Sequence, residues 1–159
     1  LRGLMLEHGL DPEDYISHLS QLDLSDVAPN PALADTLNRL EGRKIIYTNA
    51  FTQHTREVME RIGITAHFDA VYDIGDADYV PKPAIDSYRR LCTLHDVDPT
   101  RAAMVEDISR NLEPAAELGM MTVWVKTDTN WAKDVTDTDH IDHITDDLTA
   151  WLQNVGNSG

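Results

Sequence analysis

Short apolar runs alternate with helical patterns along most of this chain, and that alternation limits the possible folds more than any other feature. Four runs have the character of buried strands: 44–49, 68–74, 102–107 and 121–126. Between them, three segments space their apolar side chains as amphipathic helices do: 54–62, 83–96 and 109–120. Strands that alternate with helices of this length form a parallel sheet covered on both faces. The sequence therefore predicts an α/β fold.

The flanking segments extend this pattern at both ends. Residues 1–9 and 13–22 are predicted to form two short helices, and a turn at 24–31 leads into a helix that ends near Leu40. After residue 126 we expect a polar loop, a short edge strand at 143–146 and a closing helix at 146–155.

Composition excludes several classes of function. The 159 residues are enough for about one domain, and 42% of them are hydrophobic, as in globular proteins. A formal net charge of −15 disfavours binding to nucleic acid, whose phosphates an acidic surface repels. No apolar run is long enough to cross a bilayer and no secretory signal is evident, so we expect a cytoplasmic protein. The single cysteine, Cys92, is compatible with a reducing compartment.

Three polar clusters fall at or just beyond the ends of predicted strands. Thr48 and Asn49 follow the first strand, Lys82 lies in the loop YVPKP after the second, and Glu106 and Asp107 end the third. The carboxyl ends of parallel strands lie along one edge of a sheet, where open α/β folds hold their ligands. We therefore expect the three clusters to converge there.

Together these side chains are suited to a phosphoryl group. Thr48 and Asn49 would donate hydrogen bonds to phosphate oxygens, and Lys82 would offset charge that develops during transfer. Asp107, with Glu106 beside it, would hold Mg²⁺, which prefers carboxylate, water and phosphate oxygens. Each has a plainer interpretation: Thr48 and Asn49 as a helix cap, Lys82 as a surface lysine, Glu106 as a structural carboxylate.

These segments resemble the haloacid dehalogenase-like (HAD) superfamily of phosphohydrolases. YTN at 47–49 is similar to its second motif, the lysine of VPKP to its third, and VEDISRNLEPAAELGMMTVWV at 105–125 to its fourth. The wording of the fourth motif is most similar to the pyrimidine 5′-nucleotidase-like branch. The resemblance implies a Rossmann-like core over residues 29–159 and part of a small helical cap over 1–28.

The family's first motif, a strand ending in Asp-x-Asp-x-Thr that carries the nucleophile, has no counterpart in these residues. Asp76-Ala77-Asp78 lies where the family has a variable loop, and Asp137-Thr138-Asp139 follows no strand. In the family this strand lies between those that correspond to 44–49 and 102–107, and its loss would leave unpaired backbone groups. We expect residues 1–159 to be inactive on their own.

For the intact protein, the resemblance implies a Mg²⁺-dependent phosphomonoesterase that acts on a nucleotide or another small phosphate ester. An aspartyl-phosphate forms and is hydrolysed, while Lys82 and Mg²⁺ offset the charge. Three alternatives stay open: a metal-independent haloacid dehalogenase, a non-catalytic binding protein with a decayed site, and a two-component receiver. The carboxylate pair argues against the first, and the place of that pair on the third strand argues against the receiver.

Several other residues invite a functional interpretation without supporting one. His140 and His143 have a loose metal-like spacing but lie in an acidic loop, where solvated side chains are expected. His54 follows the Thr-Asn pair and could approach a substrate. Arg110 and Asn111 are expected to open a helix or to shape the metal loop, and Trp124 is expected in the core.

Overall fold

A computed structural model describes residues 23–127 and 138–156 of the chain. These residues belong to two compact units. The first contains 23–81 and 152–156, and the second contains 82–127 and 138–151. The helices predicted at 1–9 and 13–22 lie outside the described residues, so the division between a cap at 1–28 and a core at 29–159 stays a prediction.

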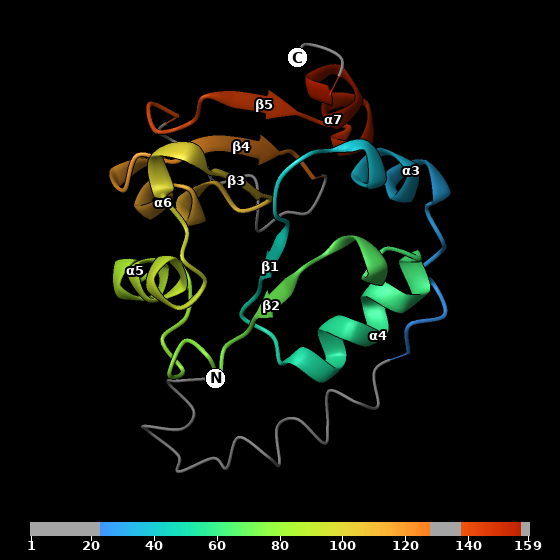
Figure 1. The fold of residues 1–159 in the computed structure, drawn as a ribbon, viewed down its shortest axis with the longest axis horizontal. Coiled ribbons are helices and arrows are strands. Elements are labelled where there is room, and N and C mark those ends of the chain that lie inside the picture. The colour runs from blue at the N-terminus through green and yellow to red at the C-terminus, as the bar shows by residue number, and fades with distance from the viewer. Residues whose placement is uncertain (1–22, 128–137, 157–159) are drawn as a thin grey trace. The chain divides into compact units, whose positions relative to one another are not determined.

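The first unit contains a pair of parallel strands flanked by helices (Figure 1). Its elements, in order, are α3 (Pro31–Arg39), β1 (Ile45–Tyr47), α4 (Thr52–Ile62), the 3₁₀ turn η1 (Thr65–His67) and β2 (Ala70–Tyr72). In the register, Ile45 lies opposite Ala70 and Tyr47 opposite Tyr72. The crossover from β1 to β2 through α4 is the βαβ connection that the alternating sequence pattern predicts.

Local sequence signals fix the helix ends in this unit. Asn30 caps α3, because its side chain accepts a hydrogen bond from the Leu33 N–H at 3.0 Å, and Pro31 follows at the first helical position. Helix α4 ends at Gly63, whose φ of 85° is the left-handed conformation that glycine adopts without a steric penalty. Because α3 and α4 have fixed ends, the strands that follow them, β1 and β2, begin at fixed residues. The loops after these strands therefore also occupy fixed positions in the chain.

The second unit contains a three-stranded parallel sheet in the order β3-β4-β5. Its elements are α5 (Ile85–Leu94), η2 (Pro99–Arg101), β3 (Ala103–Glu106), η3 (Ser109–Asn111), α6 (Glu113–Glu117), β4 (Met121–Val125), β5 (His143–Thr145) and the start of α7 (Leu148–Gly156). Helix α6 packs against α5 and β4. The core includes Leu112, Ala115 and Val123, all fully buried, and Glu106 stands at the carboxyl end of β3.

The main elements match the sequence predictions, including the short strand β5 and the closing helix α7. All described strand pairings are parallel, and they form two sheets within the described residues. The segment 109–120 differs from the single helix that its pattern predicts, since it contains η3 followed by the five-residue α6. Pro114 explains the interruption: it lies in the first turn of α6, where a missing N–H is tolerated, but it cannot donate the hydrogen bond to residue 110 that a continuous helix over 109–120 would need.

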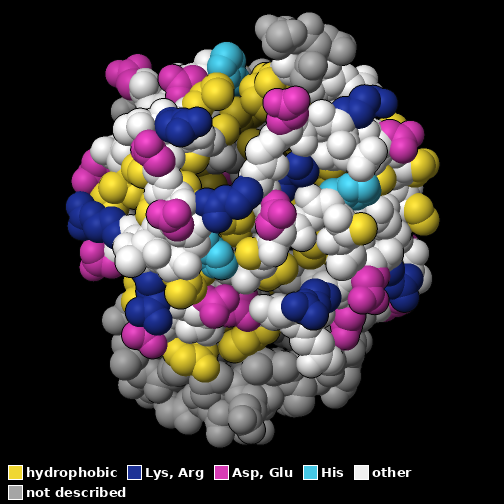
Figure 2. All heavy atoms as spheres, in the orientation of Figure 1, with side chains coloured by type: hydrophobic (Ala, Val, Ile, Leu, Met, Phe, Trp, Pro, Cys, Tyr) yellow, Lys and Arg dark blue, Asp and Glu magenta, His cyan; other side chains and the backbone are white. Residues whose placement is uncertain are grey.

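Charge on the visible surface is mixed. Figure 2 shows Lys and Arg side chains interspersed among Asp and Glu side chains on the face that it displays. On this face the acidic side chains are therefore not gathered in one patch. Within residues 23–127 and 138–156, no helix is both long enough and apolar enough to cross a membrane.

Candidate active site

The Thr48–Asn49 pair lies in the loop that leads from β1 to α4, in the first unit. The Thr48 N–H donates to the Tyr72 carbonyl at 3.0 Å, which continues the pairing of β1 with β2 by one residue. The Thr48 hydroxyl oxygen accepts a hydrogen bond from the Ala50 N–H at 3.0 Å. Because this contact uses the hydroxyl as an acceptor, its own hydrogen can still be donated to a ligand oxygen.

Asp73, which the sequence did not single out, holds the other end of this loop. Its Oδ2 accepts hydrogen bonds from the Thr52 N–H at 2.8 Å and the Thr52 hydroxyl at 2.7 Å. Its Oδ1 accepts from the N–H groups of Gly75 and Asp76. Burial opposes ionisation of the Asp73 carboxyl, but these hydrogen bonds outweigh it and hold the pKa below its usual value.

Lys82 and Glu106 meet as an ion pair in the second unit. The Lys82 Nζ lies 2.5 Å from the Glu106 Oε2, and the two side chains are only 8% and 7% exposed. Twenty-four positions separate them in the chain, and the parallel topology brings the loop before α5 to the carboxyl end of β3. The sequence predicts this convergence. Whether Thr48 and Asn49 share the same edge stays a prediction.

A chain of buried hydrogen bonds holds the Glu106 carboxylate in addition to its contact with Lys82. Its Oε1 accepts from the Asn111 side-chain amide at 3.0 Å, and the Asn111 carbonyl accepts from the Tyr88 hydroxyl at 2.5 Å. Asn111 is 3% exposed and Tyr88 is fully buried. Asn111 therefore does more than open the following helix, since its side chain fixes one oxygen of Glu106. Tyr88 was missed because a tyrosine inside a helical pattern resembles any other core residue.

The pKa values of the neighbouring Glu106 and Asp107 carboxyls shift in opposite directions. Burial favours the neutral form of Glu106, but the charge of Lys82 and the hydrogen bonds from Lys82 and Asn111 lower its pKa. Burial, a hydrogen bond with Glu106 and the negative charge of Glu106 raise the pKa of Asp107. The Asp107 backbone carbonyl accepts a hydrogen bond from the Trp124 indole N–H at 2.9 Å, so the turn after β3 is fixed to β4.

The remaining candidates have other contacts. Asp76 and Asp78 belong to the turn after β2, where the Asp76 carboxylate accepts from the Asp73 N–H at 3.2 Å, while Asp137 lies outside the described residues. The Nε2 of His140 contacts the Ser109 carbonyl at 3.0 Å, and the ring of His143 packs near Trp151. Within the described part of the chain, no three His, Cys, Asp or Glu side chains gather as a metal site.

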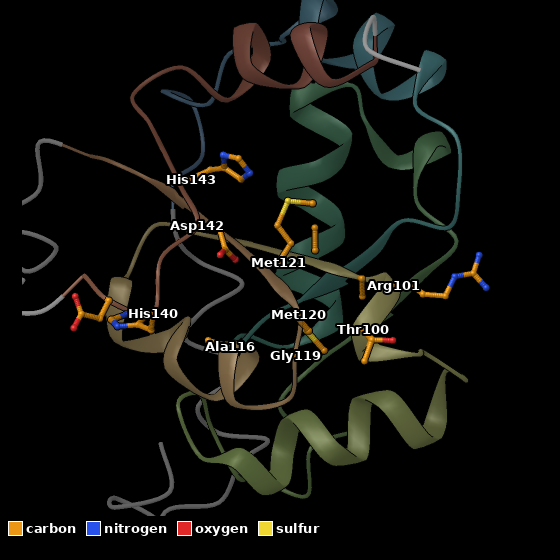
Figure 3. Close-up of a pocket in the computed structure, with 12 residues that line it drawn as sticks. Thr100, Arg101, Ala116, Gly119, Met120, Met121, His140, Asp142 and His143 are labelled. Carbon is orange, nitrogen blue, oxygen red and sulfur yellow. The ribbon is translucent and has the colours of Figure 1, made fainter.

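A groove of about 710 Å³ occupies a different place in the second unit (Figure 3). Residues at which the three strands begin line it, among them Ala103, Met121 and His143. In a parallel sheet this edge is opposite the carboxyl ends, so the groove is separate from the pair of Lys82 and Glu106. No sequence pattern predicts a ligand site at this groove.

Comparison with known families identifies the family to which the chain belongs. Its parallel strands and helices define an α/β fold, and the acidic pair follows the carboxyl end of β3, where open α/β sheets bind their ligands. The model of the haloacid dehalogenase-like hydrolase family matches residues 6–119, which is more than half of the chain. The chain therefore belongs to the haloacid dehalogenase-like hydrolase family.

Solved structures confirm the fold. L-2-haloacid dehalogenase from Xanthobacter autotrophicus with chloropropionic acid covalently bound is 21% identical, with a TM-score of 0.64 over 83% of this chain and 62% of that one. Another L-2-haloacid dehalogenase is 19% identical, with a TM-score of 0.67 over 99% of this chain and 69% of the other. A haloacid dehalogenase-like protein of unknown function from Agrobacterium tumefaciens is 18% identical, with a TM-score of 0.62 over 98% and 72%.

These similarities establish architecture and leave the reaction open. At 18% to 21% identity they show that this chain shares the core of the dehalogenase structures. The chain spans 62% of the length of the Xanthobacter enzyme and 55% of another dehalogenase. The comparisons do not assign the chain to a branch of the family, so the chemistry of the site has to distinguish the branches.

Proposed function

We propose that the protein is a Mg²⁺-dependent phosphomonoester hydrolase that acts on a nucleotide or another small phosphate ester. The observation that carries this proposal is the buried pair of Lys82 and Glu106, with the Asp107 carboxyl next to it at the carboxyl end of β3. A lysine and two adjacent carboxyls supply opposite charges within one small volume. Such an arrangement suits a cation and a polyanionic phosphoryl group bound side by side.

The carboxyls fit a hard divalent cation. Mg²⁺ in phosphoryl-transfer sites takes one or two protein carboxylates and completes its shell with water and phosphate oxygens. Asp107 would be the principal ligand, because both oxygens of Glu106 already accept hydrogen bonds, from Lys82 and Asn111. Glu106 would act as a further ligand or fix the turn that carries Asp107. When bound, the cation would offset negative charge on the phosphoryl oxygens.

The other residues would bind and orient the substrate. Lys82 would place its charge against a phosphoryl oxygen, while the Thr48 hydroxyl and the Asn49 amide donate hydrogen bonds to the remaining oxygens. The nucleophile would be an aspartate of the family's first motif. Its carboxylate oxygen forms a bond to phosphorus as the bond to the leaving alcohol breaks, and water then releases phosphate from the aspartyl-phosphate.

Haloacid dehalogenation is the second candidate, favoured by the likeness to dehalogenase structures. The test uses the protein expressed from its full reading frame, assayed on p-nitrophenyl phosphate, nucleoside 5′-monophosphates and 2-chloropropionate. We expect phosphate release that needs MgCl₂ and stops with EDTA. Halide release without phosphate release, or phosphate release unaffected by EDTA, would overturn the proposal.

A variant pair assigns this activity to the site. Asp107→Asn keeps the size of the side chain but removes its charge, and we expect kcat to fall by about 10²-fold or more. Asp146→Asn makes the same chemical change at an exposed position after β5 and serves as the control. Equal activity of the two variants would exclude Asp107 from the metal site.

A further inference from the structure

We propose that Asp73 is a positioning residue that fixes the 48–52 loop, on which the proposed function places the phosphate contacts. This inference rests on the proposed function and extends it to a residue that does not itself touch the substrate. Asp73 lies one residue beyond β2, and Thr52 is the first residue of α4. The carboxylate therefore links the end of one strand to the start of the helix that follows the other.

The carboxylate of Asp73 is saturated with donors. Oδ2 takes both the N–H and the hydroxyl of Thr52, at 2.8 and 2.7 Å. Oδ1 takes the N–H groups of Gly75 and Asp76, at 2.8 and 2.9 Å. One oxygen thus belongs to the turn after β2, and the other reaches 21 residues back to the 48–52 loop. Hydrogen bonds to an ionised acceptor are stronger than neutral ones, so this contact orients Thr52 firmly.

Backbone contacts show that the whole loop depends on residues 72–74. The Tyr72 carbonyl accepts from the Thr48 N–H at 3.0 Å, and the Ile74 N–H donates to the Ala50 carbonyl at 3.3 Å. Asp73 adds a third attachment, at Thr52, through its side chain. The loop is therefore held at its start, middle and end.

Helix α4 gives a reason for the carboxylate to come from another element. Its cap residue is Phe51, whose side chain accepts no hydrogen bond from the first turn. The Asp73 carboxylate takes the Thr52 N–H instead, and places a negative charge at the positive end of the helix dipole. A cap supplied by the following strand couples the start of α4 to the turn after β2.

A second Asp–Thr contact provides a matched control. Asp98 accepts from the Thr100 N–H at 3.0 Å and the Thr100 hydroxyl at 2.7 Å, which is the same pair of donors. That contact is local to η2 and leaves the 48–52 loop untouched. Asp98→Asn therefore makes the same chemical change as Asp73→Asn without altering that loop.

The test measures phosphate affinity in the protein expressed from its full reading frame. In Asp73→Asn the amide N–H₂ faces donors in place of an acceptor, and we expect the KM for p-nitrophenyl phosphate and the inhibition constant for inorganic phosphate to rise about tenfold. Asp98→Asn is expected to leave both constants unchanged. Thr52→Val removes only the hydroxyl bond, and Thr52→Ser, which keeps it, is expected to bind phosphate more tightly than Thr52→Val.

The outcomes separate this inference from the proposed function. If the wild type hydrolyses phosphate esters and Asp73→Asn matches Asp98→Asn in KM and in phosphate inhibition, the positioning role is wrong and the proposed function stands. The same holds if Thr52→Ser and Thr52→Val have equal affinity. If the wild type neither hydrolyses phosphate esters nor binds inorganic phosphate, the proposed function fails and this inference fails with it. Should Asp73→Asn not fold, the two Thr52 variants decide.

Discussion

The 48–52 loop of the first unit and the Lys82–Glu106 pair of the second are held in contrasting ways. The loop is fixed by backbone hydrogen bonds and by the partly exposed carboxylate of Asp73. The pair is fixed by a buried charge contact, behind which Asn111 and Tyr88 form a buried chain of hydrogen bonds. The loop relies on several hydrogen bonds that are partly exposed to solvent, and the pair relies on a few buried contacts between charged groups.

This difference determines how much stability each region loses when a substitution removes one of its contacts. Removing one member of a buried ion pair leaves the other as an unpaired charge in a low dielectric, which is strongly destabilising. Water can partly replace a hydrogen bond lost near the surface, so the loop should tolerate single losses with a smaller change in stability. We therefore expect stability to report on the pair, and phosphate affinity to report on the loop.

The largest effect is expected from Lys82→Met, which leaves Glu106 buried without its partner. The free energy of unfolding should fall by about 3–5 kcal/mol, as for other broken buried pairs. Urea unfolding followed by circular dichroism measures this change. Lys126→Met is the control, because Lys126 is exposed and contacts the Trp124 ring at 5.2 Å, an interaction of at most about 1 kcal/mol.

A double variant tests the stated cause. If the loss in Lys82→Met arises from the stranded charge, adding Glu106→Leu should restore part of the stability, because an apolar pair of similar size replaces the buried charges. Phosphatase activity should be absent from both variants, because both lack the Lys82 charge. A double variant less stable than Lys82→Met would show that the Glu106 contacts with Asn111 matter more than its charge.

An intermediate effect is expected from Tyr88→Phe, which removes one hydroxyl from the fully buried chain behind Glu106. The Asn111 carbonyl loses this donor, and we expect the free energy of unfolding to fall by about 1–2 kcal/mol. Tyr79→Phe in the first unit, where the ring packs on Phe51, is the matched change. A similar loss in both variants would contradict the contrast between the two regions, and thermal unfolding distinguishes them.

The same contrast explains what the sequence could predict. The strands, their parallel pairing and the approach of Lys82 to Glu106 follow from residue type and order, because parallel strands place their carboxyl ends along one edge, but the ion pair between the two side chains was not predicted. The break at Pro114 was readable in principle, but an otherwise regular helical pattern obscured it. Chemistry that depends on strand ends is therefore accessible from sequence.

The residues that support the site could not be predicted from the sequence in this way. Asp73 and Thr52 meet across 21 residues, and Tyr88 and Asn111 across 23, so these contacts depend on strand register and helix rotation. An Asp before a Gly-containing turn is ordinary turn chemistry, and a helical Tyr is ordinary core. Nothing local distinguishes these from the many similar residues that only cap or pack.

The smallest effect is expected in the pH dependence of stability. The folded pKa of Asp73 lies below its unfolded value, so its contribution is fully present above the unfolded pKa and is lost as pH falls through the folded pKa. Asp73→Asn should therefore lower stability at pH 7 and make the decline below about pH 4 shallower, by less than about 1 kcal/mol because the carboxylate is partly exposed and solvent screens its contacts. The pKa values of Asp98 and Asp142 are also lowered, so these two groups still contribute to the fall in stability at low pH in Asp73→Asn. Urea midpoints for wild type and Asp73→Asn across this pH range measure the difference, and parallel curves would show that the Asp73 contacts are as strong with a neutral carboxyl as with a charged one.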